Sequence, residues 1–485
     1  MKKTTLLLAG SLLASCAAQA SDDLQALRAE IAQMKQSYER RIAALEARLQ
    51  EAERAAQAAS TAQPASMSSA TPPVNPAAAA TAFNPQISLI FDGVYLGART
   101  GSSEKYEQID GINHRHAHEG HAHGGLERGF NLRATELALS GAVSPYFDAT
   151  ALITVSEHGD VELEEAWFET RQLPAGFKLR GGKFLSAIGY LNDKHPHQWD
   201  FVDQNLAYRT LLGEHGLVDT GLHFSWLPKT GRWYTQLGVE LLQGKEQTFA
   251  SSGLSLPALR ADGRPLAASS AGSLDAQRAG PRLTTLYAKF APDLGERHAL
   301  QAGLWLAHGR QHQEVHDHSA ENPASLVHAL QGKGKVWGTD WVYKYDAGRF
   351  GGEGNFKLVA EYLRQRKDLG IAFHENGARV GAPRKFTQDG FVVQGSYGFA
   401  PYWQAGVRFD ATGLTNKIEG ANGLLREYGK SDRWTLALTR QITEFSLLRL
   451  QASRARLWND GVREGVNQFF VQYQHSLGAH GAHAF

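Results

Sequence analysis

The chain has 485 residues, a formal net charge of +1 and 20 % charged residues. This balance is not typical of a nucleic-acid-binding protein or a strong anion binder, and we expect no nucleic acid among its partners. Glycine is abundant, with 50 residues, and the one strongly apolar run lies at the extreme N-terminus. Any membrane span in the mature chain must therefore be made of β-strands.

Residues 1–20 have the features of a secretory signal peptide. A basic start precedes a short apolar segment, and an A-x-A cleavage site ends at Ala20. The segment 13–16 also resembles a lipoprotein box, in which Cys16 would be lipidated. Cleavage after Ala20 is favoured because a barrel needs no lipid anchor, but either route exports the protein. Cys16 is the only cysteine, so no intrachain disulfide can form.

Residues 21–57 are predicted to form a periplasmic coiled-coil helix. They consist mainly of good helix formers, and apolar residues recur from Leu24 to Ala52 at spacings of three and four, with one extra step of four. The narrow apolar stripe favours self-association; a single solvated spacer helix is the alternative. Residues 58–84 are rich in Ala, Pro, Ser and Thr and are predicted to be a semi-rigid linker.

Residues 85–485 are predicted to be all-β, forming a transmembrane antiparallel β-barrel of about 16 strands. Apolar residues alternate with polar ones; in segment 402–410, for example, Trp403 and Val407 share one face and Gln404 and Arg408 the other. The predicted strands are 86–98, 129–143, 146–157, 160–170, 177–186, 217–226, 232–244, 281–291, 297–308, 336–346, 354–364, 389–399, 402–410, 431–440, 445–454 and 466–477. The last strand precedes a terminal Phe485, as in outer-membrane barrels.

The connections between these strands alternate between short and long. The long ones are predicted at 99–128, 187–216, 245–280, 309–335, 365–388 and 411–430. This asymmetry is typical of outer-membrane barrels, which have tight periplasmic turns and longer outer loops. An even number of strands then places both termini in the periplasm of a Gram-negative cell.

The inner face of the barrel is predicted to be polar and hydrated, because unsolvated charges would be very costly and a barrel of this size leaves an aqueous channel. Segment 187–216 is a candidate constriction loop, in which facing charges would set selectivity; a loop that caps the rim or contacts a neighbouring subunit is the alternative. The candidate pore and constriction residues are Lys178, Arg180, Lys183, Asp200, Asp203, Arg209, Arg408, Arg433 and Arg449.

Histidines cluster in two of the predicted outer loops. Imidazole is a favoured ligand for zinc, copper and nickel, and the loose setting predicts weak, exchangeable zinc rather than a required cofactor. The alternative is a solvated polar loop with an accidental histidine content. The candidate metal ligands are His114, His116, His118, His121 and His123 in the first loop, and His312, His316 and His318 in the second.

Three segments carry a resemblance to a known family: 130–133 leading into 136–141, Gly181-Gly182-Lys183-Phe184, and 199–203. Together with the strand pattern, the region from residue 86 onward resembles the phosphate-selective porin O and P family, and the helical N-terminus is similar to that of dicarboxylate porins. The resemblance implies a trimeric, sixteen-stranded passive diffusion channel. Because segment 187–216 has only Lys194 and Arg209 as strong cations, phosphate specificity is not carried over.

These observations favour an outer-membrane porin that admits small hydrophilic solutes, with histidine-rich outer loops that capture divalent metal, zinc above all, for uptake. The expected partners are outer-membrane lipid, the barrel-assembly machinery and further copies of the chain in a homotrimer. The alternatives are a structural protein that tethers the envelope, an energised receptor, or a barrel enzyme. A receptor would need a plug domain and 22 strands, and the sequence contains no G-x-S-x-G motif, so we expect no enzymatic activity.

Overall fold

The computed structural model describes residues 85–99, 126–157, 159–231, 233–266, 272–320, 322–459 and 461–478. The predicted signal peptide, coiled coil and linker lie outside the described residues, as do most of the first histidine-rich loop and the terminal residues 479–485. Within the described part of the chain, no helix is both long and apolar enough to cross a membrane.

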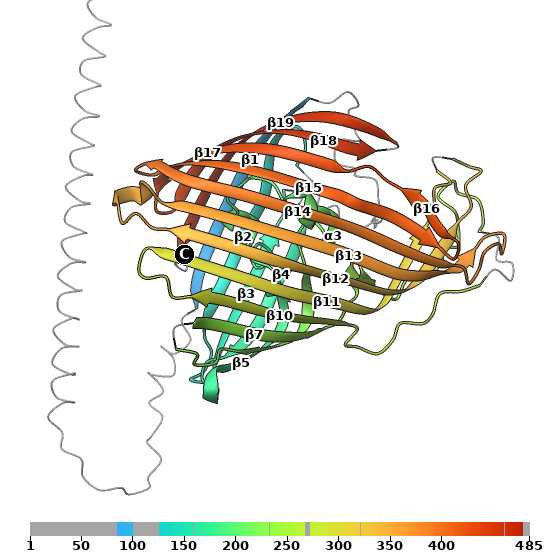
Figure 1. Ribbon diagram of the computed structural model, residues 1–485, viewed down its shortest axis with the longest axis horizontal. Helices are drawn as coiled ribbons and strands as arrows, with labels where there is room; N and C mark the ends of the chain where they lie inside the picture. The colour runs from blue at the N-terminus through green and yellow to red at the C-terminus, as the bar shows by residue number, and fades with distance from the viewer. Residues whose placement is uncertain are drawn as a thin grey trace, which may run out of the picture. The chain divides into compact units, whose positions relative to one another are not determined.

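The described residues form one closed antiparallel β-barrel, in which each strand pairs with its neighbour in sequence and the last strand returns to the first (Figure 1). Sixteen strands make up the ring. They are β1 Gln86–Arg99, β2 Gly129–Ala142, β3 Phe147–Val155, β4 Val161–Thr170, β5 Phe177–Leu185, β6 Val218–Trp226, β7 Trp233–Leu242, β10 Leu283–Pro292, β11 His298–His316, β12 His328–Tyr345, β13 Phe356–His374, β14 Pro383–Ala400, β15 Trp403–Gly420, β17 Ser431–Thr443, β18 Ser446–Asn459 and β19 Val462–Gly478.

Smaller elements lie in the connections. The hairpin β8 Glu246–Gln247 and β9 Ala250–Ser251 follows β7, and β16 Gly423–Glu427 pairs with the end of β15. The 3₁₀ helices are η1 Pro174–Gly176, η2 Pro196–Gln198 and η3 Phe350–Gly352, and the α-helix α3 spans Leu206–Leu211. Both η2 and α3 belong to the connection between β5 and β6.

The ring closes where β1 pairs with β19 over twelve residue pairs, from Ser88 opposite Gly478 to Arg99 opposite Asn467. Closure leaves no open strand edge, which is the condition for a sheet to survive in lipid. The fold class predicted from the alternating sequence is therefore confirmed, including the number of strands.

Five consecutive strands, β11 to β15, extend much further than the alternation predicts. Segment 309–335, for example, was expected to be a long loop, but residues 309–316 and 328–335 are hydrogen-bonded to each other as parts of β11 and β12. Segments 365–388 and 411–430 are likewise largely strand. The expectation of long irregular loops was wrong here. The part of each strand that extends beyond its predicted end has no regular apolar face by which it could be recognised.

The two faces of the wall differ as the period-two pattern requires. In β15, Trp403, Ala405 and Val407 are exposed on the outside, whereas Arg408 and Asp410 are buried on the inside. Part of the interior is apolar rather than hydrated. The side chains of α3, including Tyr208 and Leu211, pack with inward residues of β5 and β12 to β14.

Outward-facing aromatic residues form two rows around one side of the barrel. In the first row, Phe409 lies 4.5 Å from Trp434 and 5.6 Å from Phe391, measured between ring centroids. A second row includes Tyr397, six residues further along β14 than Phe391, or about 20 Å along a strand. Aromatic girdles that flank an apolar band of about 25 Å are the mark of a barrel immersed in lipid.

Candidate functional site

The connection between β5 and β6, residues 186–217, folds into the barrel, where α3 is visible between the walls in Figure 1. We call it the inward loop. In the ring order, β15 lies eight strands from β5 and β17 lies eight strands from β6. In a ring of sixteen these are opposite positions. A loop that starts at β5 and bonds to β15 and β17 must therefore cross the lumen.

The tip of the inward loop is held by a buried network of charges. Asp203 accepts a hydrogen bond from Arg408 Nη2 on β15 at 2.7 Å, and it also pairs with Arg433 on β17. Both guanidiniums in turn contact Asp410, at 3.1 and 3.0 Å. Gln451 on β18 donates to the same Asp203 carboxylate at 2.7 Å. Burial alone would raise the pKa of Asp203, but the Arg408 and Arg433 charges hold it well below its usual range.

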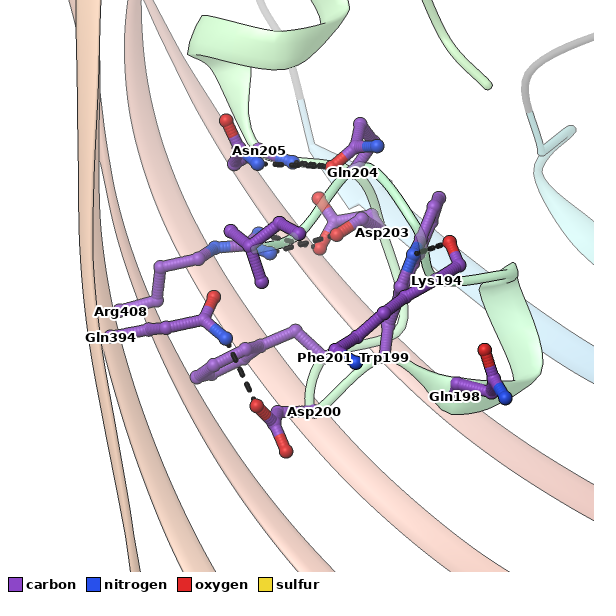
Figure 2. Close-up of a pocket in the computed structure, with 11 residues that line it drawn as sticks. Lys194, Gln198, Trp199, Asp200, Phe201, Asp203, Gln204, Asn205, Gln394 and Arg408 are labelled. Carbon is purple, nitrogen blue, oxygen red and sulfur yellow. Dashed lines mark hydrogen bonds and ion pairs between the residues drawn. The ribbon is translucent and has the colours of Figure 1, made fainter. Parts of the chain in front are cut away.

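A second contact joins the loop to β13 and β14. Lys357 Nζ lies 2.6 Å from Asp200 Oδ1. Gln394 Nε2 donates to Asp200 Oδ2 at 3.0 Å, as Figure 2 shows. Between this contact and the Asp203 network lies a recess of about 20 Å³, lined in part by Trp199 and Phe201. It has room for about one water molecule. The loop is thus closely packed against this wall.

Glu361 on β13 anchors the middle of the loop. Its buried carboxylate accepts hydrogen bonds from the Tyr190 and Leu191 backbone N–H groups, at 2.9 and 2.8 Å, and from the Tyr208 hydroxyl at 2.6 Å. The helix α3 begins at Asn205, whose side chain accepts from Tyr208 N, a standard N-cap. The N-cap and the Glu361 carboxylate together fix α3 against the wall.

On the opposite side, the loop contacts β2 and β4 through histidines. His195 lies between two consecutive glutamates of β4, with Nδ1 3.1 Å from Glu164 Oε2 and Nε2 2.5 Å from Glu165 Oε1. Next to it, His197 Nδ1 lies 3.0 Å from Glu136 Oε2 on β2. Burial favours the neutral His195 ring, but the two glutamates outweigh it and raise the pKa of His195 to about 10.

Consecutive residues of a strand normally point to opposite faces, so the shared contact of Glu164 and Glu165 needs an explanation. The β3–β4 register shifts here: Leu152 is opposite Glu165 and Ile153 is opposite Leu163, which leaves Glu164 as the extra residue of a β-bulge. A bulge re-aims a side chain locally. The acidic pair Glu164-Glu165 inside an otherwise alternating strand was the sequence signal for this site, and it was missed.

The remaining candidate pore residues are spread over the wall. Arg180 stacks over Trp167 and pairs with Glu169, which also binds Lys178. Arg449, on β18 two residues before Gln451, donates to Thr439 and Gln472. Arg209 lies half-buried on α3.

The structure contradicts one assignment to the pore, that of Lys183. This residue is on the alternate face of β5 from Lys178 and Arg180, and its ammonium donates to the Leu163 carbonyl on β4 at 2.7 Å. The reason is the period of two along a strand, which separates odd from even positions of β5.

The two groups of candidate metal ligands have different outcomes. His114, His116, His118, His121 and His123 lie outside the described residues. We expected His312 and His316 in a flexible loop, but they lie on the inward face of β11. Their Nε2 atoms lie 2.8 and 3.0 Å from the two oxygens of Glu314, which also pairs with Lys367.

The inward face of β11 to β13 carries a row of stacked imidazoles. His316 is opposite His328 in the register and His328 is opposite His374, and their ring centroids are 4.9 and 6.1 Å apart. His318, just beyond the end of β11, lies near His316, with ring centroids 6.4 Å apart and the two rings tilted by 32°. The sequence indicated histidines at this end of the barrel but not this alignment across three strands, which depends on register.

No family model matches the chain. Solved structures with a similar chain course include the outer membrane protein OmpT of Vibrio cholerae, with 9 % identity, a TM-score of 0.45 and coverage of 81 % of this chain and 98 % of that one. The outer membrane channel DcaP of Acinetobacter baumannii has 13 % identity and a TM-score of 0.45, with coverage of 81 % of this chain and 96 % of that one. The anion-selective porin from Comamonas acidovorans has 10 % identity and a TM-score of 0.45, with coverage of 81 % and 99 %. The resemblance to the phosphate-selective porin O and P family stays a prediction.

In sequence, an uncharacterized protein of Aquifex aeolicus (strain VF5) is 34 % identical over 416 residues, which are 83 % of this chain and 80 % of the relative. An identity of this size over most of both chains shows common descent. The chain therefore belongs to the family of this Aquifex aeolicus protein.

Proposed function

We propose that the protein is a narrow diffusion channel for small hydrophilic solutes in the outer membrane of a Gram-negative cell. The closed ring and the outward aromatic rows suit immersion in lipid. Barrels with about sixteen strands are wide enough to leave a path for water when nothing else fills them. Both chain ends would lie in the periplasm, on the side of the short turns, and the barrel-assembly machinery would insert the chain.

The observation that carries this proposal is the crossing of the lumen by the inward loop. A protein that merely anchors a tether needs no loop held across its interior by Asp203, Asp200 and Glu361. A loop that narrows the lumen and carries paired charges sets the size and the charge of what can pass. The loop carries both acidic and basic groups, so selectivity depends on which of them face the open path.

Single-channel recording in a planar lipid bilayer tests the proposal. The full chain should give discrete conductance steps, and a variant in which a short Gly-Ser linker replaces residues 190–211 should give markedly larger steps. A control variant in which the same linker replaces residues 421–427 of the β16 hairpin should conduct like the parent. A correctly inserted barrel that stays silent in both forms would favour the envelope tether or an enzyme.

A second candidate function is the capture of divalent metal, zinc above all, for uptake at the mouth formed by the long loops. The stacked row His316, His328 and His374 supports it, because neutral imidazoles held side by side can share a soft cation. Replacing His114, His116, His118, His121 and His123 with Asn should weaken zinc binding if the first histidine-rich loop contributes. Equal zinc affinity in parent and variant would remove that loop from the function.

Self-association as a trimer, through the barrel and the coiled coil, is part of the same proposal. It rests on the apolar spacing between Leu24 and Ala52 and on the resemblance to trimeric porins. Sedimentation of the detergent-solubilised protein, with and without residues 21–57, gives the stoichiometry directly. A monomer in both forms would contradict it.

A further inference from the structure

Glu136, Glu164 and His195 converge from three separate segments at the start of the inward loop. Glu136 comes from β2, Glu164 from the bulge in β4 and His195 from the loop itself. Each offers one ligand atom, and the three atoms lie within 4.8 Å of one another. A tetrahedral zinc ion with bonds of about 2.0–2.2 Å holds its ligands about 3.4 Å apart. Small side-chain rotations would therefore bring all three onto one ion.

The charge balance of this cluster differs from that of three other carboxylates in the lumen. Glu169, Asp200 and Asp203 each pair with a lysine or an arginine. In the part of the chain that the structure describes, the ion-pair partners of Glu136, Glu164 and Glu165 are imidazoles alone. Two imidazoles thus face three carboxylates, and a divalent cation among them would balance the remaining negative charge.

Glu164 also has an unsatisfied atom that points into the cluster. Its Oε2 is buried and has no hydrogen-bond partner of acceptable geometry, although His195 Nδ1 is only 3.1 Å away. Without a metal ion, this oxygen is balanced only by the charge of the His195 ring. A cation bound between this oxygen and His195 Nδ1 would satisfy both atoms.

The groups behind the three ligands have the arrangement that metal-binding histidines use. His195 Nε2 faces Glu165 Oε1, so a proton on Nε2 would direct Nδ1 toward the ion. Glu165 is itself held by the Trp167 indole N–H at 2.9 Å. Glu136, on the other side, is oriented by His197. Such carboxylate–histidine pairs fix the tautomer and the ring orientation of a ligand.

We propose that Glu136, Glu164 and His195 form a binding site for a divalent cation of the zinc class, oriented by Glu165, which ties the inward loop to β2 and β4. One imidazole and two carboxylates suit zinc or a similar borderline ion better than a hard cation that binds oxygen alone. This site is distinct from the histidine-rich outer segments. It requires only the fold, so it stands whether or not the barrel conducts.

Zinc titration of the full-length protein tests the site. The background protein for this titration is made without a histidine affinity tag and with Asn in place of the five histidines between 114 and 123. Bound metal is removed from it with a chelator in detergent. Against this background, Glu164→Gln and His195→Asn should each lower zinc affinity at least 10-fold, and Glu165→Gln about 10- to 100-fold. Glu169→Gln is the matched control on the same strand, with its charge already paired, and it should bind zinc like the parent.

Cobalt supplies a readout that a purely structural role of these residues would not change. Bound Co²⁺ should give the visible absorption of a tetrahedral or five-coordinate ion, and this signal should be lost in His195→Asn and kept in Glu169→Gln. Heat-modifiable migration on gels checks that each variant is folded. If His195→Asn does not fold, the zinc and cobalt measurements on Glu165→Gln test the site instead. Unchanged zinc affinity and an unchanged cobalt spectrum in folded Glu164→Gln and Glu165→Gln would overturn the proposal.

Discussion

The Asp203 carboxylate lies 2.7 Å from Arg408, although 205 positions separate the two residues in sequence. This contact joins the tip of the inward loop to the wall opposite the strand from which the loop departs. Arg433 shares the same carboxylate, so Asp203 of the loop and Asp410 of β15 together balance two buried cations. The position of the loop tip, and with it the cross-section left open, depends on this group.

Replacing Asp203 with alanine should release the loop tip. Removing one partner of a buried ion pair costs about 3–5 kcal/mol, because the remaining charges stay desolvated. We expect lower thermal stability, larger single-channel conductance and a shift of the reversal potential toward anions, since two arginines lose a counter-charge.

Asp148→Ala is the control for this variant. The Asp148–Arg171 pair is 3.4 Å long and about half exposed, so its loss should cost only about 0–1 kcal/mol. If Asp203→Ala conducts and unfolds like Asp148→Ala, the loop tip is not held by this ion pair.

Gly390 on β14 provides a steric test of α3. A Cβ added there would lie 2.8 Å from Ala207 Cβ and 3.0 Å from Ala207 Cα, so Gly390→Val must push the helix away from the wall. Overpacking of this kind costs about 1–3 kcal/mol. Bilayer recording should show altered conductance, and Gly395→Val on the same strand, where the nearest atom is 3.7 Å away, should behave like the parent. Equal conductance in the two variants would show that α3 does not border the path.

Acid should loosen the contact of Asp203 with Arg408 and Arg433. The pKa of Asp203 is lowered from 3.8 in the folded protein, because Arg408 and Arg433 outweigh the effect of burial. A lowered carboxyl pKa contributes stability in full above the unfolded value, and this contribution is lost as the pH falls below it. Conductance should therefore be steady from neutral pH down past about pH 4 and rise only well below it, as the pH approaches the lowered pKa of Asp203 in the folded protein. An Asp203→Asn variant cannot titrate and should lack this rise; an identical acid response in that variant would assign the transition to another group.

The lipid-facing surface can be tested with a single charge. Leu436 on β17 points outward, is 59 % exposed and lies two residues from Trp434 in the first aromatic row. Arginine at the middle of a lipid-facing band costs about 2–4 kcal/mol, against about 0–1 kcal/mol near its edge. Folding into liposomes, followed by gel mobility, should be impaired by Leu436→Arg. Leu424→Arg, on the β16 hairpin beyond the ring and 57 % exposed, should fold like the parent; equal folding of the two would exclude a membrane band at β17.

Much of the wall could be predicted from the sequence because each strand has its own alternation of apolar and polar residues. In β15 the alternation from Trp403 to Asp410 identifies both the strand and its two faces without reference to any other residue. The same local rule separates Lys183 from Lys178 and Arg180, which have the opposite parity on β5, so the assignment of Lys183 to the pore departed from the rule. The rule fails for the part of β11 beyond Gly309, where Gln311 to Glu314 are polar on both faces.

The sequence by itself determined the closed barrel, because sixteen alternating segments and short turns allow no other way to pair every strand. Only the tertiary structure decided what lies inside it. The pairing of Asp203 with Arg408 and Arg433, and the meeting of His195 with Glu136 and Glu164, join residues far apart in the chain and depend on register, a bulge and the path of one loop. No local pattern encodes these contacts, because each joins residues that only the closed ring brings together.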